Sequence, residues 1–283
     1  MKKKITNAIC IVLLLIPAVL AVAPLLFLLT GSVMDTSEIR EYIGPVLGDG
    51  EGFAVWRLFP MYPTVLNVIE LFFDSPEFFQ MFWNSMKITA GILTGQLLFG
   101  MPAAWGLAQY EFPGKRAVYF SYIVLMLMPF QVTMLSEYIV LDLLGLTDTL
   151  SAVILPGMFL TFPPFLMYRF FSEIPPALIE AARVDGAGEL AVFFRIGIPV
   201  GSSGIISALV LQFLECQSMV EQPLIFLKTK RLWPLSLYLP EVDLSHAGSA
   251  LCASFVALVP ALFVFLYGQD YLEQGIVASA IKE

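Results

Sequence analysis

Charged side chains are scarce in this chain of 283 residues: they make up 13% of it, whereas hydrophobic residues make up 58%. A water-soluble globular protein carries about 25% charged and about 45–50% apolar residues. So little charge cannot cover the surface of a soluble domain of this length, which excludes a soluble enzyme and a disordered chain. The formal net charge of -8 also excludes a nucleic-acid-binding protein.

Histidine and cysteine are scarce as well. The one histidine is His246, and the three cysteines, Cys10, Cys216 and Cys252, lie in apolar runs without the spacing of metal ligands. The sequence contains no Ser/His/Asp constellation and no phosphate-binding G-x-x-x-x-G-K-[ST] motif. We therefore expect a chain that is not an enzyme, has no catalytic residues, binds no metal or cofactor and does not itself hydrolyse ATP.

Long apolar runs are what the sequence has in excess. A membrane-spanning helix needs about 20 apolar residues, and six runs qualify: residues 9–29, 86–108, 117–141, 149–171, 204–226 and 247–268. The first run also fits a signal peptide, but its apolar residues continue past the small-residue cleavage pattern, which favours a retained helix. The sequence thus predicts an all-α integral membrane protein, with residues 1–283 forming a single transmembrane domain.

The distribution of Lys and Arg predicts the orientation of these spans. A cytoplasmic N-terminus places nine of these residues inside and six outside, and six spans then return the C-terminus to the cytoplasm. Residues 30–83 become an extracellular segment, and residues 172–203 become a cytoplasmic loop. The extracellular segment holds eight acidic residues and two arginines, so -6 of the net charge of -8 lies there.

Polar residues inside the fifth span form one stripe. They are Gln212, Glu215, Ser218 and Gln222, which at about 100° per residue fall within an arc of about 120°. Such residues are costly in a membrane unless they face protein or water. The stripe predicts either a hydrated passage for a polar solute or a face that hydrogen-bonds to a neighbouring helix.

Prolines are expected to bend three successive spans, because a freed carbonyl is tolerated only where protein or a water-filled cavity covers it. They are Pro102, Pro129, Pro156, Pro163 and Pro164. These bends are compatible with ordinary kinked helices and with a permeation path.

The cytoplasmic loop reads as a short helix, a turn and a second helix. Pro175 and Pro176 suit the first turn of a helix, and Gly186 suits the left-handed residue that ends it. A second helix over residues 189–195 is expected to stop at Pro199. A short helical loop that is held between two membrane spans can transmit a mechanical force. The same pattern also fits an inert amphipathic loop.

The motif in this loop, Glu180-Ala-Ala-x-x-Asp-Gly-Ala187 followed by Phe193, Ile196 and Pro199, resembles the EAA loop of ABC-importer permease subunits. The resemblance implies the type I ABC-importer permease fold, in which this loop is a coupling helix that docks on a cytoplasmic ATPase subunit. The residues it assigns to ATPase coupling are Glu180, Ala181, Ala182, Asp185, Gly186, Ala187, Phe193 and Pro199.

Other segments are similar to the carbohydrate permeases of the maltose-transporter type. They are Asn84-Ser85, Pro113-Gly-Lys-Arg116, Met128-Pro-Phe-Gln-Val132 and the tail Gln269-x-x-Leu-x-x-Gly275-x-x-x-Ser-Ala-Ile-Lys282. In that group the tail reaches the ATPase dimer, which implies this role for Gln269, Gly275 and Lys282. The chain departs from the group in the fifth span, where Gln217-Ser-Met219 stands in place of Trp-Asn-acid.

The resemblance implies a sugar importer, for an oligosaccharide, in the bacterial cytoplasmic membrane. The implied partners are a second homologous permease subunit, two ATPase subunits that bind ATP–Mg, and an extracellular solute-binding protein, besides membrane lipid and the sugar. Two alternatives stay open. One is an ABC permease for peptides or amino acids, which shares the EAA loop. The other is a self-contained secondary transporter or channel that uses Glu215 as its ion or proton site.

Overall fold

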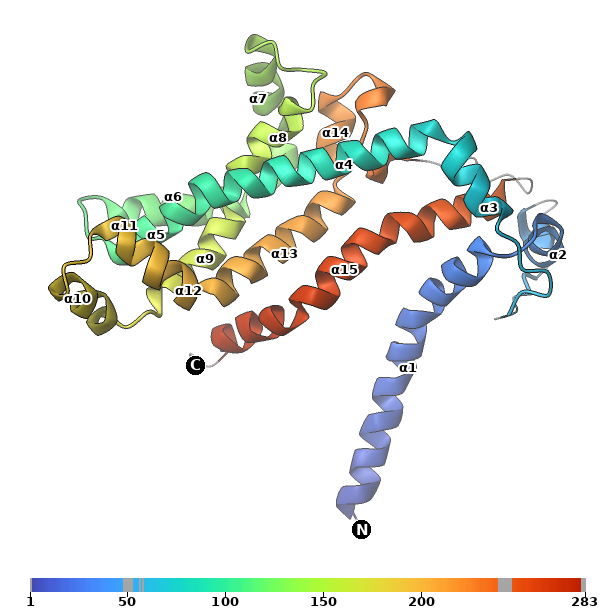
Figure 1. Ribbon diagram of the computed structural model, residues 1–283, viewed down its shortest axis with the longest axis horizontal. Coiled ribbons are helices and arrows are strands. Elements are labelled where there is room, and N and C mark those ends of the chain that lie inside the picture. The colour runs from blue at the N-terminus through green and yellow to red at the C-terminus, as the bar shows by residue number, and fades with distance from the viewer. Residues whose placement is uncertain (1, 48–52, 56, 58, 239–245, 281–283) are drawn as a thin grey trace. The chain divides into compact units, whose positions relative to one another are not determined.

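The computed structural model describes residues 2–47, 53–55, 57, 59–238 and 246–280 (Figure 1). Lys282, one of the predicted tail residues, lies outside the described residues, and Gly275 is described only as part of a helical backbone. The chain forms two compact units, Met1–Phe79 with Leu239–Pro260 and Gln80–Tyr238 with Ala261–Glu283. Each unit is considered by itself.

The first unit is built from helices around a small apolar core. Its elements are α1 (Lys2–Ser32), α2 (Thr36–Leu47), α3 (Leu66–Ile69), the π-helical turn η1 (Glu70–Asp74) and the first part of α15 (Ala247–Ala280). Met34, Ile39, Tyr42 and Ala247 form the buried core. The Asn67 amide, itself buried, donates hydrogen bonds to the carbonyl oxygens of Ser32 at 3.1 Å and Met34 at 2.8 Å, which fixes the end of α1.

The second unit contains the remaining helices. They are α4 (Pro76–Gly95), η2 (Gln96–Gly100), α5 (Met101–Gln109), α6 (Lys115–Leu127), α7 (Phe130–Leu143), α8 (Ser151–Met158), α9 (Phe162–Ser172), α10 (Pro176–Val184), α11 (Glu189–Val192), η3 (Phe193–Gly197), α12 (Ile198–Val200), α13 (Ser202–Ser218), α14 (Glu221–Phe226), η4 (Lys230–Leu232) and η5 (Leu235–Leu237). Helix α9 packs against both α5 and α13, and α10 and α11 lie together at one end of these helices (Figure 1).

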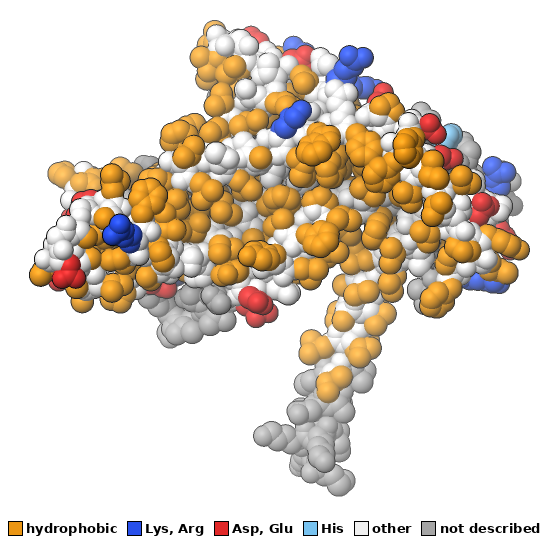
Figure 2. Space-filling view, viewed as in Figure 1, with side chains coloured by type: hydrophobic (Ala, Val, Ile, Leu, Met, Phe, Trp, Pro, Cys, Tyr) orange, Lys and Arg blue, Asp and Glu red, His pale blue; other side chains and the backbone are white. Residues whose placement is uncertain are grey.

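Four helical segments among the described residues are long and apolar enough to cross a membrane: Leu13–Ser32, Pro76–Gln109, Ser151–Ser172 and Ala247–Glu273. Two bent helix pairs raise the number to six if each pair is counted as one span. Apolar side chains cover most of the face seen in Figure 2, as expected of a surface in contact with lipid. The predicted class, an all-α membrane protein, is confirmed.

Three predicted spans are not continuous helices, and one of them, residues 149–171, is interrupted between the end of α8 at Met158 and the start of α9 at Phe162. Residues 117–141 bend by 101° between α6 and α7, because a residue that precedes proline is driven out of the helical region; Met128, before Pro129, has φ -75° and ψ 122°. Residues 204–226 are interrupted at Met219, which is extended. Pro223 cannot donate to the Met219 carbonyl, and the Ser236 hydroxyl donates to that oxygen instead.

The end predicted for the second loop helix is wrong. Helical structure continues through Pro199 to Val200, and the bend of 71° falls at Gly201. The π-helical turn η3 ends at Gly197, two residues before Pro199, and its wider turn moves the backbone bonds away from the i−4 pattern that a proline ring obstructs.

Candidate functional site

Helix α10, which carries most of the predicted coupling residues, has well-defined ends. Pro176 occupies its first turn, where a missing N–H is no loss. At its other end Gly186 has φ +85°, and its N–H donates to the Arg183 carbonyl at 3.0 Å. The Ala187 N–H donates to the Ala182 carbonyl at 2.9 Å. These two bonds form a Schellman motif, so Ala182, Gly186 and Ala187 build the turn that ends α10.

One face of α10 is anchored in the second unit. Ile179 is 3% exposed and joins a buried cluster with Ile174 and Phe171. The cluster continues through Trp105 of α5, whose ring centroid lies 5.3 Å from that of Phe171 and 5.6 Å from that of Phe193. Through Ile179, α10 shares one buried apolar cluster with side chains of α5 and α9.

The opposite face of α10 is open and partly apolar. Glu180 and Ala181 are exposed, Leu178 is 43% exposed and Val184 is 86% exposed. These apolar side chains lie open on a helix outside the candidate membrane spans. Two predicted coupling residues lie elsewhere: Phe193 belongs to the buried cluster, and Pro199 is exposed on α12.

A polar clasp ties α10 to α11 and to the end of α5. The Arg183 guanidinium donates to the Glu189 carboxylate at 2.8 and 3.0 Å, and the Tyr110 hydroxyl donates to the same carboxylate at 2.7 Å. The hydrogen bond from Arg183 to Glu189 raises the pKa of Arg183 above its ordinary value. The hydrogen bonds among Arg183, Glu189 and Tyr110 are exposed, so they orient α10 relative to α11 more than they stabilise the fold.

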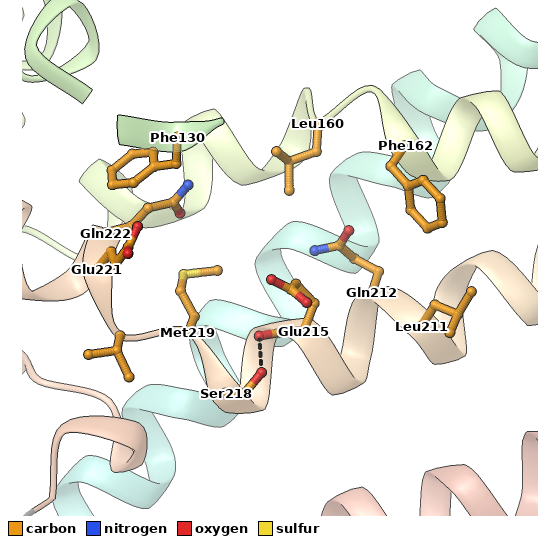
Figure 3. A pocket seen from close by; sticks show the side chains of 11 residues that line it. Phe130, Leu160, Phe162, Leu211, Gln212, Glu215, Ser218, Met219, Glu221 and Gln222 are labelled. Atoms are coloured by element: carbon orange, nitrogen blue, oxygen red, sulfur yellow. Dashed lines mark hydrogen bonds between the residues drawn. The ribbon is translucent and has the colours of Figure 1, made fainter. Parts of the chain in front are cut away.

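The predicted polar stripe lines a cavity of 790 Å³. Gln212, Glu215 and Ser218 come from α13, and Gln222 comes from α14. In Figure 3 the Gln212 and Glu215 side chains point from α13 into the space below Leu160. The structure therefore brings all four predicted pathway residues together at one hollow.

Glu221, which the sequence reasoning missed, also lines this cavity. It accepts hydrogen bonds from the Gln131 amide at 2.8 and 2.6 Å. A helical wheel drawn through the fifth span gives the wrong directions beyond Met219, because the helix is interrupted there. The proline at position 223 was the one signal in the sequence for this interruption.

A second cavity of 640 Å³ adjoins the first and shares Phe130, Leu160 and Gln222 with it. Glu137 of α7 lines the second cavity. The Oε2 atom of Glu137 and the Oε1 atom of Gln222 are buried and have no hydrogen-bond partner among the described residues. No group of three or more His, Cys, Asp or Glu side chains within the described ranges is arranged to hold a metal ion.

The base of the predicted tail packs on α13. The Ser207 hydroxyl donates to the Tyr271 carbonyl at 2.7 Å, and Gly268 lies so close to Val210 that an added Cβ atom would come within 2.4 Å of its side chain. Gln269 is exposed beside this contact. These contacts hold the start of the tail segment of α15 against α13. The predicted contact of the tail with an ATPase stays a prediction.

The Asn84-Ser85 pair holds a loop that is distant in the sequence. The Asn84 amide donates to the carbonyl oxygens of Arg231 at 2.7 Å and Trp233 at 3.2 Å. The Ser85 hydroxyl accepts a hydrogen bond from the Leu235 N–H at 2.8 Å. The pair therefore pins the loop between α14 and α15 to helix α4.

The chain is similar to known transport proteins along most of its length. Residues 96–278 match the family model described as "Binding-protein-dependent transport system inner membrane component". The chain is 27% identical to the arabinooligosaccharides transport system permease protein AraQ of Halalkalibacterium halodurans, over 94% of this chain and 92% of that protein. It is 25% identical to the sn-glycerol-3-phosphate transport system permease protein UgpE of Rhizobium meliloti, over 98% of each.

A further relative is the diacetylchitobiose uptake system permease protein NgcG of Streptomyces coelicolor, which is 26% identical over 89% of this chain and 82% of that protein. Among solved structures, the fold is similar to a chain of a bacterial ABC transporter involved in the import of the acidic polysaccharide alginate. That match has a TM-score of 0.80 and 19% identity and covers 96% of this chain and 98% of that chain. At this identity it shows a common fold.

Proposed function

The chain belongs to the family of binding-protein-dependent transport system inner membrane components, and from this premise we propose that it is one of two different permease subunits of an ATP-driven sugar importer. As a member of that family it is a multi-pass transport component of the inner membrane and not an enzyme. In this proposal two ATPase subunits bind ATP–Mg and an extracellular solute-binding protein delivers the sugar. Both termini of the chain lie in the cytoplasm.

The observation that carries the proposal is the construction of α10. One face of this helix is buried against α5 and α9 through Ile179, and the other leaves Val184 86% exposed. A helix that is rigidly joined on one side and apolar on its open side is suited to receive force from a partner protein. We assign that partner as the ATPase subunit, which contacts Glu180 and Ala181 and the turn at Gly186.

Helix α9 connects the buried cluster beneath α10 with the cavity. Its last turn carries Phe171, which packs in the buried cluster beneath α10, and its first residue, Phe162, lines the 790 Å³ cavity. At about 1.5 Å of rise per residue, the two side chains are on the order of 14 Å apart along one rigid helix. Closure of the ATPase dimer would push α10, and α9 would carry the displacement to the cavity wall.

A sugar is the solute that the cavity and the relatives support. Amide, carboxylate and hydroxyl groups meet two phenylalanine rings in one hollow, a combination that suits a polar ligand with apolar ring faces. Two of the relatives are permeases for arabinooligosaccharides and for diacetylchitobiose. We propose an oligosaccharide as the solute, and the pathway residues as Gln212, Glu215, Ser218 and Gln222.

The test compares this chain alone with the complete importer in proteoliposomes. Co-expression of the chain with its partner subunits provides the complete complex. We expect ATP-dependent sugar uptake by the complete importer and no flux through the chain alone. Flux through the chain alone that depends on Glu215 would refute the importer assignment in favour of a self-contained transporter, and uptake of di- or tripeptides in place of sugars would refute the solute.

A further inference from the structure

The two adjoining cavities are lined by negative charge that no cationic side chain offsets. Glu215 and Glu221 line the first cavity, and Glu137 lines the second. None of the described residues that line either cavity is Lys, Arg or His. With no cation among the lining residues, these carboxylates repel an anionic solute, and the repulsion weakens as water and salt screen it.

Two hydroxyl groups that line the cavities already donate to backbone carbonyls of the chain. The Ser218 hydroxyl donates to backbone carbonyls within α13, and the Thr133 hydroxyl donates to the Phe130 carbonyl at 3.2 Å. The protons of both hydroxyls are therefore already used. The Glu221 carboxylate accepts hydrogen bonds from the Gln131 amide, which is not among the residues that line either cavity.

The carboxylates that line the two cavities, Glu215 and Glu221 in the first and Glu137 in the second, accept hydrogen bonds when ionised. The carboxylate of a uronic acid offers acceptors only, and an ionised phosphate is likewise rich in acceptors, whereas every sugar hydroxyl offers a proton. The wall is thus complementary to a ligand that has many hydroxyl groups and no negative charge.

Gln212 provides a fixed donor among these acceptors. Its side chain is 3% exposed and points into the cavity (Figure 3), and its amide has only a long contact, 3.5 Å, to the sulfur of Cys216. That weak contact leaves the amide able to donate to a ring or glycosidic oxygen. Phe130 and Phe162 add flat apolar surface to the same hollow, against which the C–H face of a pyranose can pack.

We propose that these cavities select uncharged, polyhydroxylated solutes and exclude anionic ones, so that the solute is a neutral oligosaccharide and neither a sugar phosphate nor a uronate. The proposal rests on the proposed function and narrows its substrate class. Glu215 and Gln212 determine this selectivity, since both point into the first cavity (Figure 3). The relatives do not decide between a neutral and an anionic solute. One of them is named as a permease for sn-glycerol-3-phosphate, and a similar fold occurs in an alginate importer.

The test measures binding of four probes to the complete importer in lipid nanodiscs, without its binding protein, by saturation-transfer difference NMR. The neutral probes are arabinotriose and N,N′-diacetylchitobiose, and the anionic probes are sn-glycerol 3-phosphate and an alginate trisaccharide. We expect transfer to at least one neutral probe and at least about fivefold less transfer to both anionic ones, because like charges repel. Equal or stronger transfer to an anionic probe would overturn the proposal, as would the absence of transfer to all four.

Variants at Glu215 make the test specific to the cavity. Glu215→Lys should reverse the preference toward the anionic probes, and Glu215→Gln should weaken the discrimination while neutral probes still bind. Glu111→Gln, a matched loss of one carboxylate on the cytoplasmic turn where the Glu111 side chain is 88% exposed, should change neither. If Glu215→Lys leaves the preference as it was, the cavity does not select by charge.

Failure of this proposal is separable from failure of the proposed function. ATP-driven uptake of an anionic sugar by the complete importer would leave the importer assignment standing and overturn the selectivity. Binding of neutral probes without any ATP-driven uptake would leave the selectivity standing and overturn the importer assignment.

Discussion

The amide of Gln96 donates a hydrogen bond of 3.2 Å to the carbonyl oxygen of Leu160, which is the carbonyl that Pro164 leaves without its helical donor. The same amide donates to the Gly157 carbonyl at 3.1 Å. Gln96 is fully buried and lies at the start of the π-helical turn η2. The Gln96 side chain of the second span thus donates hydrogen bonds to backbone carbonyl oxygens at the break between α8 and α9. Leu160, which lies in this break, lines both cavities.

Replacing Gln96 by Leu should destabilise the second unit. The Leu160 carbonyl would lose its donor, at a cost of about 1–3 kcal/mol when no water replaces it, and the Gly157 carbonyl would keep only a 3.4 Å bond from the Leu160 N–H. Gln96→Glu, which has nearly the same shape but is acceptor-only when ionised, should be at least as harmful. Thermal unfolding of the purified complex measures the effect, and Gln80→Leu, at an exposed position of α4, is the control. Wild-type stability of Gln96→Leu would mean that other groups satisfy the break.

The turn that ends α10 can be tested with the same substitution at two nearby glycines. Gly186 has φ +85°, so Gly186→Ser forces a side chain into the left-handed region at a cost of about 1–2 kcal/mol. Gly188 is the N-terminal capping residue of α11, with φ -73° and ψ 162°, where serine is preferred. We expect Gly186→Ser to reduce ATP-driven uptake and Gly188→Ser to preserve it.

Steric clash does not explain that difference, because a Cβ atom at either glycine meets no heavy atom within 4 Å. Amide hydrogen exchange of α10 provides the second readout, and the last turn of the helix should exchange faster in Gly186→Ser alone. Equal uptake by the two variants would show that the left-handed turn does not matter for coupling.

Glu180→Lys should uncouple transport and leave the fold intact. Glu180 is exposed on the open side of α10, so reversing its charge changes the proposed contact with the ATPase and little else. We expect uptake and substrate-stimulated ATP hydrolysis to fall more than about tenfold, as for a charged group lost from an interface, with an unchanged melting temperature. Glu173→Lys, on the exposed turn before α10, is the control. Normal uptake by Glu180→Lys would remove this residue from the coupling surface.

Local signals in the sequence were sufficient for α10. Proline at a first turn and glycine at a left-handed position act on their own neighbours, so Pro176 and Gly186 are interpretable without knowledge of the fold. The polar stripe of α13 was also predictable, since Gln212, Glu215 and Ser218 belong to one regular helix. The predicted left-handed conformation of Gly186 is confirmed.

Contacts between distant segments were not predictable in this way. The partners of Asn84 lie 147 and 149 residues away, and nothing near Asn84 in the sequence specifies them. The direction of Glu221 depends on the interruption at Met219, which in turn depends on a hydroxyl from Ser236. The continuous span expected for residues 204–226 was wrong for this reason.

Asp148 offers a test of the loop that follows α14. It has φ +57°, and its carboxylate accepts hydrogen bonds from the Lys228 N–H at 2.9 Å and from the Thr229 N–H and hydroxyl at 2.8 and 2.7 Å. The hydrogen bond from the Thr229 hydroxyl, followed by that from its N–H, lowers the pKa of Asp148 below the ordinary value of 3.8. The folded state therefore favours the charged carboxylate.

Asp148→Asn should lower the melting temperature of the complex at neutral pH, and the difference from the wild type should shrink in acid. A carboxyl group whose pKa is lower in the folded state contributes stability above its unfolded value, about 3.9, and loses that contribution as the pH falls through the folded pKa. Asparagine tolerates the left-handed backbone, so the comparison isolates the charge. Asp142→Asn, which removes a carboxylate with one 3.3 Å bond from Thr147, should show a smaller effect. A difference for Asp148→Asn that stays constant from neutral pH to pH 3 would show that its charge does not hold the loop.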